Sequence, residues 1–572
     1  MDHNENLNNL RAKLPEIGAD AILIARNNSF GNFSRDTATL EYISGFSGSN
    51  GRAVISQNKA ILSVDGRYIK QAAQQADGKI WEIGMYPELD VFGMIKKLVK
   101  KGETLVISPF SSTYKSYLDI LKLSDELGFK IKVLDKTPFG ENEVSNVKLF
   151  LMDENDTGET RLDRINRIKD TLNNKEAVLL TEKSIIGWIF GLRLAKITED
   201  KCVLPVCVAL IQKSQKPIIF CDLELTEKTE DFDFIRLDKF KETIKSIDKT
   251  IINCDFQTTF VHFPIIMQNN GFSIRQSRVF YGGFEAVKNP VEIRNQKKAA
   301  ELTSIAFIKA LAYSETCERT TEIDVSDLFE NELRKNETFI GLSFNTISSF
   351  GNNTAMVHYD PKTLGNCKID SDGLFLFDAG AHFKNSTTDM TRTIYRGDNP
   401  SDELKTIYTT LLKSLVMFST AKFPNKTRAC RLDSIARFWV WKEGFDYRFG
   451  TGHGVGNFGN VHEHPSISPN SNENITENMT ITIEPGIYLK DLGIRIENMV
   501  LTKCSDKNPE HIEFETMNFI PFCRKLIKKE MLNASELNWL NNYHKTTYEK
   551  FREMFQKDSI TSNWLKENTL LI

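Results

Sequence analysis

Acidic side chains in the last third of the chain stand in segments that otherwise read as β-strand. Asp378 follows the apolar run "LFLF", and Asp389 begins the alternating run "TDMTRTIY". Because a hairpin would bring the ends of these two strands together, the sequence predicts that the two carboxylates lie close to each other. Acids at such positions are candidates for chemistry, because strands usually carry core residues there.

Further candidate ligands follow along the chain. The segment "GTGHGVGNFGNVHEHP" predicts a glycine-rich loop that carries His453 and His462. "MTITIEPGIYL" places Glu484 at the end of a strand, and "GIRIENMV" places Glu497 within another. Taken singly, each residue has an ordinary explanation: an Asp forms a turn, a His lies in a loop, and a strand Glu faces solvent.

The ordinary explanations are less satisfactory for the group as a whole. Carboxylates held close together repel one another, and burying each of them unpaired costs several kcal/mol. Two divalent cations remove this penalty, and a set of two Asp, two Glu and one His suits manganese or another borderline divalent ion. We therefore expect two metals about 3.5–4 Å apart, with a shared water converted to hydroxide near neutral pH. A sheet is the rigid frame that such ligands require.

The elements that position these ligands are predicted to follow a domain boundary near residue 288. Asn289 stands at a plausible N-cap, Pro290 at the first helical position and Glu292 at the third. Residues 289–572 are therefore expected to form the catalytic domain, which ends in the helical sequence "ASELNWLNNYHKTTYEKFREMF".

The first half of the chain is predicted to hold two similar α/β domains, residues 1–155 and 156–288, joined by a polar stretch at 153–160. In each domain an apolar helical face precedes the strand "AILIA" or "AVLL". Two strands around a polar turn follow in both cases. The two helical faces are Leu7, Leu10, Leu14 and Ile17, and Leu162, Ile165, Ile168 and Leu172.

Bulk composition excludes several classes of function. A length of 572 residues predicts about three domains, and a net charge of −3 gives no case for nucleic acid or an anionic membrane as a partner. No apolar run approaches the ~20 residues that span a bilayer, and the amino terminus has no signal core. Nine cysteines without a CxxC pair argue against a disulfide framework and against a thiolate zinc site. We expect a cytoplasmic protein.

Four motifs taken together resemble a known family. "FDAGAHFKNSTTDMTRT", "GTGHGVG", "TIEPGIY" and "IRIEN", in this order, are similar to the pita-bread metallopeptidases, which include methionine aminopeptidase, prolidase and aminopeptidase P. The two preceding α/β domains, with "ISGFSGSNGRAVI" and "DGRY", and the carboxy-terminal "PFCRKLI" resemble the long, three-domain form of aminopeptidase P. The resemblance implies that Asp389 and Glu497 bridge the metals. It implies five metal ligands: Asp378, Asp389, His453, Glu484 and Glu497.

The resemblance also implies an activity, which is hydrolysis of the first peptide bond of peptides with proline in second place. A metal-bridging hydroxide would attack the carbonyl carbon. Proline lacks an N–H and its ring fixes the backbone, so general aminopeptidases handle such bonds poorly. The implied cofactors are two divalent ions, with Mn²⁺ expected, and the implied assembly is a homodimer. No nucleic-acid or membrane partner is expected.

Motif matches assign further roles. His358 in "VHYDP" and His462 in "NVHEHP" match substrate-binding histidines that stabilise the tetrahedral intermediate and pass a proton to the leaving nitrogen. Glu484 is expected to manage the proton of the attacking water, and with His453 it joins the substrate-binding set. Arg67 in "DGRY" matches a residue that contacts the peptide, although a solvated arginine in a turn explains it as well.

One residue departs from the family pattern. The family usually has a histidine directly before "GTGHGVG", and this chain has Phe449, whose ring cannot donate a hydrogen bond. The protein could therefore be slower or differently selective. His382 and His464 receive no role and are expected at the surface or behind the ligands. Three alternatives stay open: a prolidase limited to Xaa-Pro dipeptides, a creatinase-like hydrolase, and a non-catalytic peptide- or histone-binding module.

Overall fold

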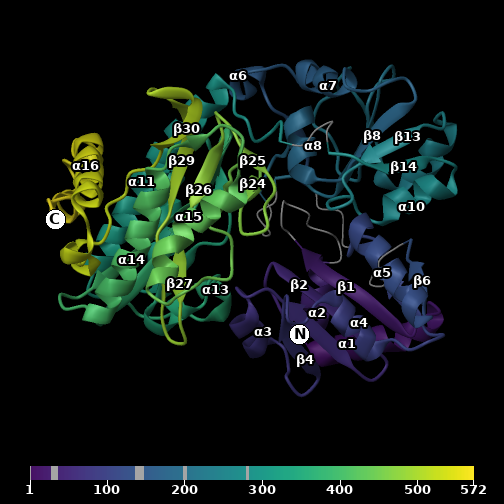
Figure 1. Ribbon diagram of the computed structural model, residues 1–572, viewed down its shortest axis with the longest axis horizontal. Helices are drawn as coiled ribbons and strands as arrows, with labels where there is room; N and C mark the ends of the chain where they lie inside the picture. Colours follow the sequence, from purple (N-terminus) through teal and green to yellow (C-terminus); the bar gives the residue numbers. More distant parts are fainter. Residues whose placement is uncertain (1, 28–36, 136–146, 198–202, 279–282) are drawn as a thin grey trace. The chain divides into compact units, whose positions relative to one another are not determined.

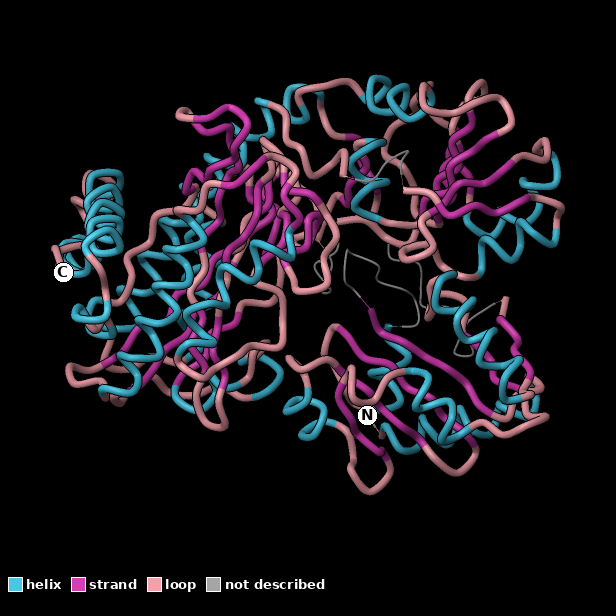
Figure 2. Tube along the Cα trace, in the orientation of Figure 1, coloured by secondary structure: helices cyan, strands magenta, loops and turns pink. Residues whose placement is uncertain are grey.

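The computed structural model describes residues 2–27, 37–135, 147–197, 203–278 and 283–572. The chain divides into two compact units. The first unit holds most of residues 1–282, and the second holds residues 283–572 together with the short segment 155–158 and Ile197. Helices and strands alternate in both units, which confirms the expected α/β and α+β fold class (Figures 1 and 2).

The first unit contains a six-stranded sheet in the order β4-β3-β2-β1-β5-β6. The central strand β1 runs antiparallel to β2 and parallel to β5. Its apolar side chains and the buried face of α1 form a core, as the leucine spacing predicted. The strands are β1 (Ala21–Asn27), β2 (Asn50–Ser56), β3 (Ala60–Val64), β4 (Trp81–Met85), β5 (Thr104–Ile107) and β6 (Lys130–Val133). The helices are α1 (His3–Glu16), α2 (Thr37–Ser44), α3 (Ile69–Gln75), α4 (Val91–Leu98) and α5 (Tyr114–Leu127).

A second six-stranded sheet repeats this topology in the order β12-β11-β10-β8-β13-β14. Its central strand β8 is antiparallel to β10 and parallel to β13. The strands are β8 (Glu176–Leu180), β10 (Cys207–Gln212), β11 (Ile218–Cys221), β12 (Asp233–Ile235), β13 (Ile251–Cys254) and β14 (Ser273–Gln276). The other elements are α7 (Arg161–Lys169), α8 (Lys183–Phe190), α9 (Phe240–Thr243), α10 (His262–Asn269), β7 (Leu149–Leu151) and β9 (Leu192–Leu194). The internal repeat is thus present, while the domain limits 1–155, 156–288 and 289–572 stay a prediction.

Two leucines of the second helical face are placed differently from the prediction. Leu162 lies in the first turn of α7 and is 48% exposed, because the buried face of this helix is formed by Ile165, Ile168 and Arg164. Leu172 is buried, but it follows the end of the helix.

The second unit opens with α11 (Pro290–Thr316), which begins at the predicted residue. The Asn289 side chain accepts from the Val291 and Glu292 N–H groups, each at 3.0 Å, and the Glu292 carboxylate accepts from the Asn289 N–H. Apolar faces of the long helices pack on the sheets in one continuous core. The remaining helices are α6 (Glu154–Thr157), α12 (Glu322–Leu333), α13 (Pro361–Leu364), α14 (Asp402–Ser419), α15 (Ala429–Lys442), α16 (Ala534–Phe551) and α17 (Ser559–Asn568).

Two sheets of this unit carry the candidate ligands. One has the order β16-β17-β20 and the other has the order β21-β30-β29-β26-β23-β24. The first sheet consists of β16 (Ile347–Phe350), β17 (Gly373–Ala379) and β20 (Met390–Arg396). The second consists of β21 (Phe423–Pro424), β23 (Gly452–Gly454), β24 (Glu463–Ile467), β26 (Thr480–Ile483), β29 (Asn498–Ser505) and β30 (Asn508–Thr516).

Shorter strands complete the unit. They are β15 (Phe339–Leu342), β18 (Ala381–Phe383), β19 (Ser386–Thr387), β22 (Thr427–Arg428), β25 (Asn474–Ile475), β27 (Gly486–Tyr488) and β28 (Gly493–Arg495). Strands β18 and β19 lie in the connection between β17 and β20, so this connection is longer and more ordered than a simple hairpin turn. Within the described ranges, no helix is both long and apolar enough to cross a membrane.

Candidate metal centre

Two antiparallel strands bring the predicted aspartates together. Strand β17 pairs with β20 in a register that sets Asp378 opposite Thr391, and Asp389 directly precedes β20. Both aspartates are buried. Burial raises the pKa of the Asp389 carboxyl well above its usual range, and the neighbouring carboxylates Asp378 and Glu484 raise it further.

His453 lies in a strand, β23, and the prediction of a loop at this position is wrong. The glycines around it serve close packing of backbones rather than a loose turn. A Cβ atom added at Gly452 would lie 2.0 Å from the main-chain oxygen of Thr482, so only glycine fits there. His462 does lie in a loop, just before β24, as predicted.

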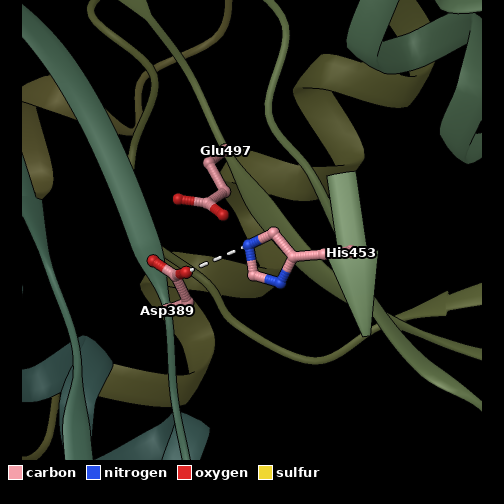
Figure 3. Close-up of side chains that lie close together, drawn as sticks. All are labelled: Asp389, His453 and Glu497. Carbon is pink, nitrogen blue, oxygen red and sulfur yellow. Dashed lines mark ion pairs between the residues drawn. The ribbon is translucent and has the colours of Figure 1, made fainter. Parts of the chain in front are cut away.

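Three of the candidate ligands converge on one point (Figure 3). One ligand atom from each of Asp389, His453 and Glu497 lies within 4.8 Å of the other two, and all three residues are buried. His453 Nε2 is 3.4 Å from Asp389 Oδ2 and 3.4 Å from Glu484 Oε1. Glu484 follows strand β26 directly, and its N–H donates to the Thr451 carbonyl at 2.7 Å.

Glu497 does not lie within a strand, contrary to the prediction. It falls between β28 and β29, which belong to different sheets, so the chain crosses from one sheet to the other at this residue. Strand β20 holds it there: the Glu497 N–H donates to the Thr391 carbonyl at 3.0 Å, and Glu497 Oε2 accepts from Thr391 Oγ1 at 2.8 Å.

The negative charge at this point is only partly balanced by protein groups. Arg495 forms a buried ion pair with Asp378 and also contacts the Tyr488 hydroxyl. Burial raises the pKa of the Glu497 carboxyl, with Asp389 and Glu484 as the next causes. Within the described part of the chain, Asp378 Oδ1 and Glu497 Oε1 are buried and accept no hydrogen bond. Oxygen atoms in this situation fit divalent cations.

The structure gives different surroundings to the two predicted substrate-binding histidines. The ring centroid of His462 is 4.3 Å from that of His453, with the two rings steeply inclined. His358 is half-buried and follows Val357, whose carbonyl accepts from Arg495 Nη1 at 3.4 Å.

The two histidines without a predicted role are both buried, so neither is a surface residue. His464 Nδ1 pairs with Glu473 Oε1 at 2.5 Å, and His382 Nδ1 lies 3.0 Å from Thr387 Oγ1.

Arg67 belongs to the first unit, where it makes a fixed set of contacts. Its Nε and Nη2 atoms donate to the two carboxylate oxygens of Asp65 at 3.0 and 2.7 Å. The guanidinium also lies 5.3 Å from the ring centroid of Tyr68. Arg67 is therefore not a freely solvated arginine in a turn. Its contact with a peptide stays a prediction.

Arg495 is part of this centre, although it was not among the predicted site residues. The available signal was its position two residues before Glu497 in the alternating run "GIRIENMV". Alternation places such residues on the same side of an extended chain, where a cation next to predicted carboxylates is informative.

The geometry agrees with comparisons to known proteins. Residues 294–503 match metallopeptidase family M24, residues 510–572 match the C-terminal region of peptidase M24, and residues 6–131 match the creatinase/prolidase N-terminal domain. The probable Xaa-Pro aminopeptidase P of Tuber melanosporum (strain Mel28) is 31% identical over 93% of each chain. The chain belongs to metallopeptidase family M24. The matching N-terminal domain and the curated relatives that match over almost the whole chain place this M24 peptidase in the aminopeptidase P group, as the motifs indicated.

Two further comparisons cover this M24 peptidase from end to end. The probable Xaa-Pro aminopeptidase P of Pyrenophora teres f. teres (strain 0-1) is 30% identical over 100% of this chain and 93% of that one. The crystal structure of the X-prolyl aminopeptidase from Caenorhabditis elegans superposes with a TM-score of 0.91 at 26% identity, covering 100% of both chains. That protein is described as a cytosolic enzyme with a dinuclear active site.

Proposed function

We propose that this M24 peptidase removes the first residue from peptides with proline in second place. The observation that carries the proposal is the buried convergence of Asp389, His453 and Glu497, with Glu484 in contact with the same imidazole. The relatives that match over almost the whole chain are named for the Xaa-Pro bond, which supports this substrate class.

The residues of the centre would hold two divalent ions. Asp389 and Glu497 are the proposed bridging pair, as the resemblance to the family implies, and a ligand atom of each lies within 4.8 Å of the other. Asp378, His453 and Glu484 complete the set. We favour Mn²⁺, because oxygen ligands with a single imidazole suit it. Bound ions would supply an acidified water and polarise the substrate carbonyl.

The side chains around the ligands would handle protons and charge. Glu484 is half-buried beside His453 and would accept the proton of the attacking water. His462 and His358 would donate to the oxygen of the tetrahedral intermediate and protonate the proline nitrogen as it leaves. Arg67 is proposed as a further contact of the peptide, as its motif match implies.

The setting and assembly are part of the proposal. The eight cysteines that lie in the described residues are all free, and the similar C. elegans enzyme is cytosolic, which supports a cytoplasmic location. Cys202 lies outside the described residues. We propose a homodimer, which the exposed Phe438 and Trp441 on α15 support, with exposures of 48% and 51%.

The substrate proposal is tested with Arg-Pro-Pro, an Xaa-Pro dipeptide and creatine as parallel substrates of the Mn²⁺-loaded enzyme. We expect release of arginine from the tripeptide and much slower turnover of the other two. Preference for the dipeptide would indicate a prolidase, and turnover of creatine would indicate a creatinase-like enzyme. No turnover of any substrate would favour a non-catalytic binding module.

A further inference from the structure

Arg392 is a fully buried cation on the ligand strand β20, three residues after Asp389. All of its nitrogen atoms donate hydrogen bonds, and every acceptor is a neutral oxygen. The acceptors are the carbonyls of Ile520 (3.1 and 2.9 Å), Thr391 (2.8 Å) and Glu497 (2.5 Å), Asn498 Oδ1 (2.8 Å) and the Tyr543 hydroxyl (2.7 Å). Because the guanidinium group is planar and rigid, these hydrogen bonds fix the relative positions of the groups that they join.

The position of the Glu497 backbone depends on these hydrogen bonds, because Glu497 lies where the chain crosses from one sheet to another. A backbone carbonyl within a strand is held by the ladder, whereas at this crossing the Glu497 carbonyl accepts from Arg392 Nη1 instead. The direction of the Glu497 side chain toward Asp389 and His453 depends on this backbone position (Figure 3).

Arg392 also donates to helix α16, which precedes the last helix α17 and belongs to neither of the two sheets that carry the ligands. The Tyr543 hydroxyl accepts from Arg392 and from the Ile520 N–H at 3.0 Å, and it donates to the Asn518 carbonyl at 3.1 Å. The Arg392 guanidinium also lies 4.3 Å from the ring centroid of Phe522. The contacts therefore run from α16 through one guanidinium to the backbone of a candidate ligand.

We propose that Arg392 and Tyr543 are positioning residues that make α16 a structural part of the metal centre. They hold the backbone of Glu497 so that its carboxylate is preorganised to bind a divalent ion. This inference rests on the proposed metal site, and its test separates the two. Loss of the hydrogen bonds made by Arg392 and Tyr543 weakens metal binding even where the protein stays folded, because such outer partners orient the metal ligands.

The decisive variant is Tyr543→Phe, which keeps the ring and removes only the hydroxyl. Tyr408→Phe is the matched control: Tyr408 is buried like Tyr543, and its hydroxyl accepts from the Cys523 N–H at 2.9 Å in the same carboxy-terminal region, without a hydrogen bond to Arg392. Metal-free full-length protein is titrated with Mn²⁺ by calorimetry, and the thermal unfolding of each metal-free form is recorded.

We expect similar losses of thermal stability in both variants, but about 10-fold weaker binding of at least one Mn²⁺ only in Tyr543→Phe. Equal Mn²⁺ affinities in the two variants, or equal weakening in both, would overturn the inference. If wild-type protein binds no Mn²⁺, the proposed metal site itself fails.

If Tyr543→Phe does not fold, the same comparison is made with Arg392→Lys. Its control is Arg396→Lys on the same strand, whose Nη1 donates to the Ser314 carbonyl at 2.6 Å. We expect roughly 10–100-fold weaker binding in Arg392→Lys alone, and equal affinities would again overturn the inference.

Discussion

Arg495 forms a buried ion pair with Asp378, one of four carboxylates that crowd the candidate metal centre. Burial lowers the pKa of the Arg495 guanidinium, but Tyr488, Asp378 and Glu484 outweigh this effect and raise it. The arginine therefore stays charged. In the metal-free protein Arg495 offsets part of the carboxylate charge, and bound cations would offset the rest.

Replacing Arg495 by methionine is expected to destabilise the metal-free protein strongly. Removing one partner of a buried ion pair leaves the other charge uncompensated, at a cost of about 3–5 kcal/mol. Urea unfolding of the chelated protein measures this loss. Arg319→Met, at an exposed position of the same unit, is the control and should change the free energy of unfolding little. Equal stability of the two variants would show that the pair has no such role.

Removal of the metals is expected to destabilise the protein more at pH 8 than at pH 6. Burial, followed by neighbouring carboxylates, raises the pKa values of Asp389 and Glu497 in the metal-free state. A raised pKa in the folded state favours folding at low pH, and this contribution is lost as the pH rises through the folded-state value. Bound cations replace the protons, so Mn²⁺ binds more tightly at higher pH.

Thermal unfolding with and without EDTA, at both pH values, measures this effect. The gain in Tm from Mn²⁺ should be larger at pH 8. A gain that is the same at both values would mean that metal binding displaces no proton from these carboxyls.

Asp389→Ala is expected to abolish most of the activity and to weaken the binding of both metals, because Asp389 is the proposed bridge. A loss of about 4 kcal/mol in transition-state stabilisation corresponds to roughly 1000-fold in kcat/KM. Hydrolysis of Arg-Pro-Pro and metal content after dialysis are the two measurements. Asp370→Ala, at an exposed residue, should behave as wild type. Near-normal turnover of Asp389→Ala in excess Mn²⁺ would rule out the bridging role.

Phe449→His is expected to raise turnover about 2- to 10-fold, which is less than the roughly 100- to 10,000-fold that a fully positioned proton donor supplies. Phe449 packs near Tyr447 and Tyr488, with ring centroids 5.1 and 5.8 Å apart, and Tyr488 contacts Arg495 of the centre. A histidine at position 449 would add a hydrogen-bond donor beside these two tyrosines. Phe449→Leu keeps an apolar side chain and should leave kcat nearly unchanged. If neither variant changes kcat, Phe449 serves packing alone.

Local signals in the sequence predicted much of this fold. The capping residues at Asn289 predicted the start of α11, and the leucine spacing in the first helix predicted its buried face. Motif spacing predicted residues that the structure brings together around His453. These features depend on neighbours a few residues apart, which a single sequence displays directly.

Other features depend on contacts between distant segments, and the sequence did not reveal them. His453 reads as part of a loop because glycines flank it, but those glycines are required by the close approach of another strand. The partners of Arg392 come from residues 497, 498, 520 and 543, and no spacing in the chain indicates that they meet. The exposure of Leu162 likewise depends on which face of its helix meets the sheet.

Calorimetric titration of Mn²⁺ into chelator-stripped wild-type protein, with hydrolysis of Arg-Pro-Pro followed on the same samples, tests the central claim most directly. We predict two ions bound per chain and activity that returns as the sites fill. Binding of fewer than two ions per chain, or full activity in the stripped protein, would contradict a dinuclear centre built from these five side chains.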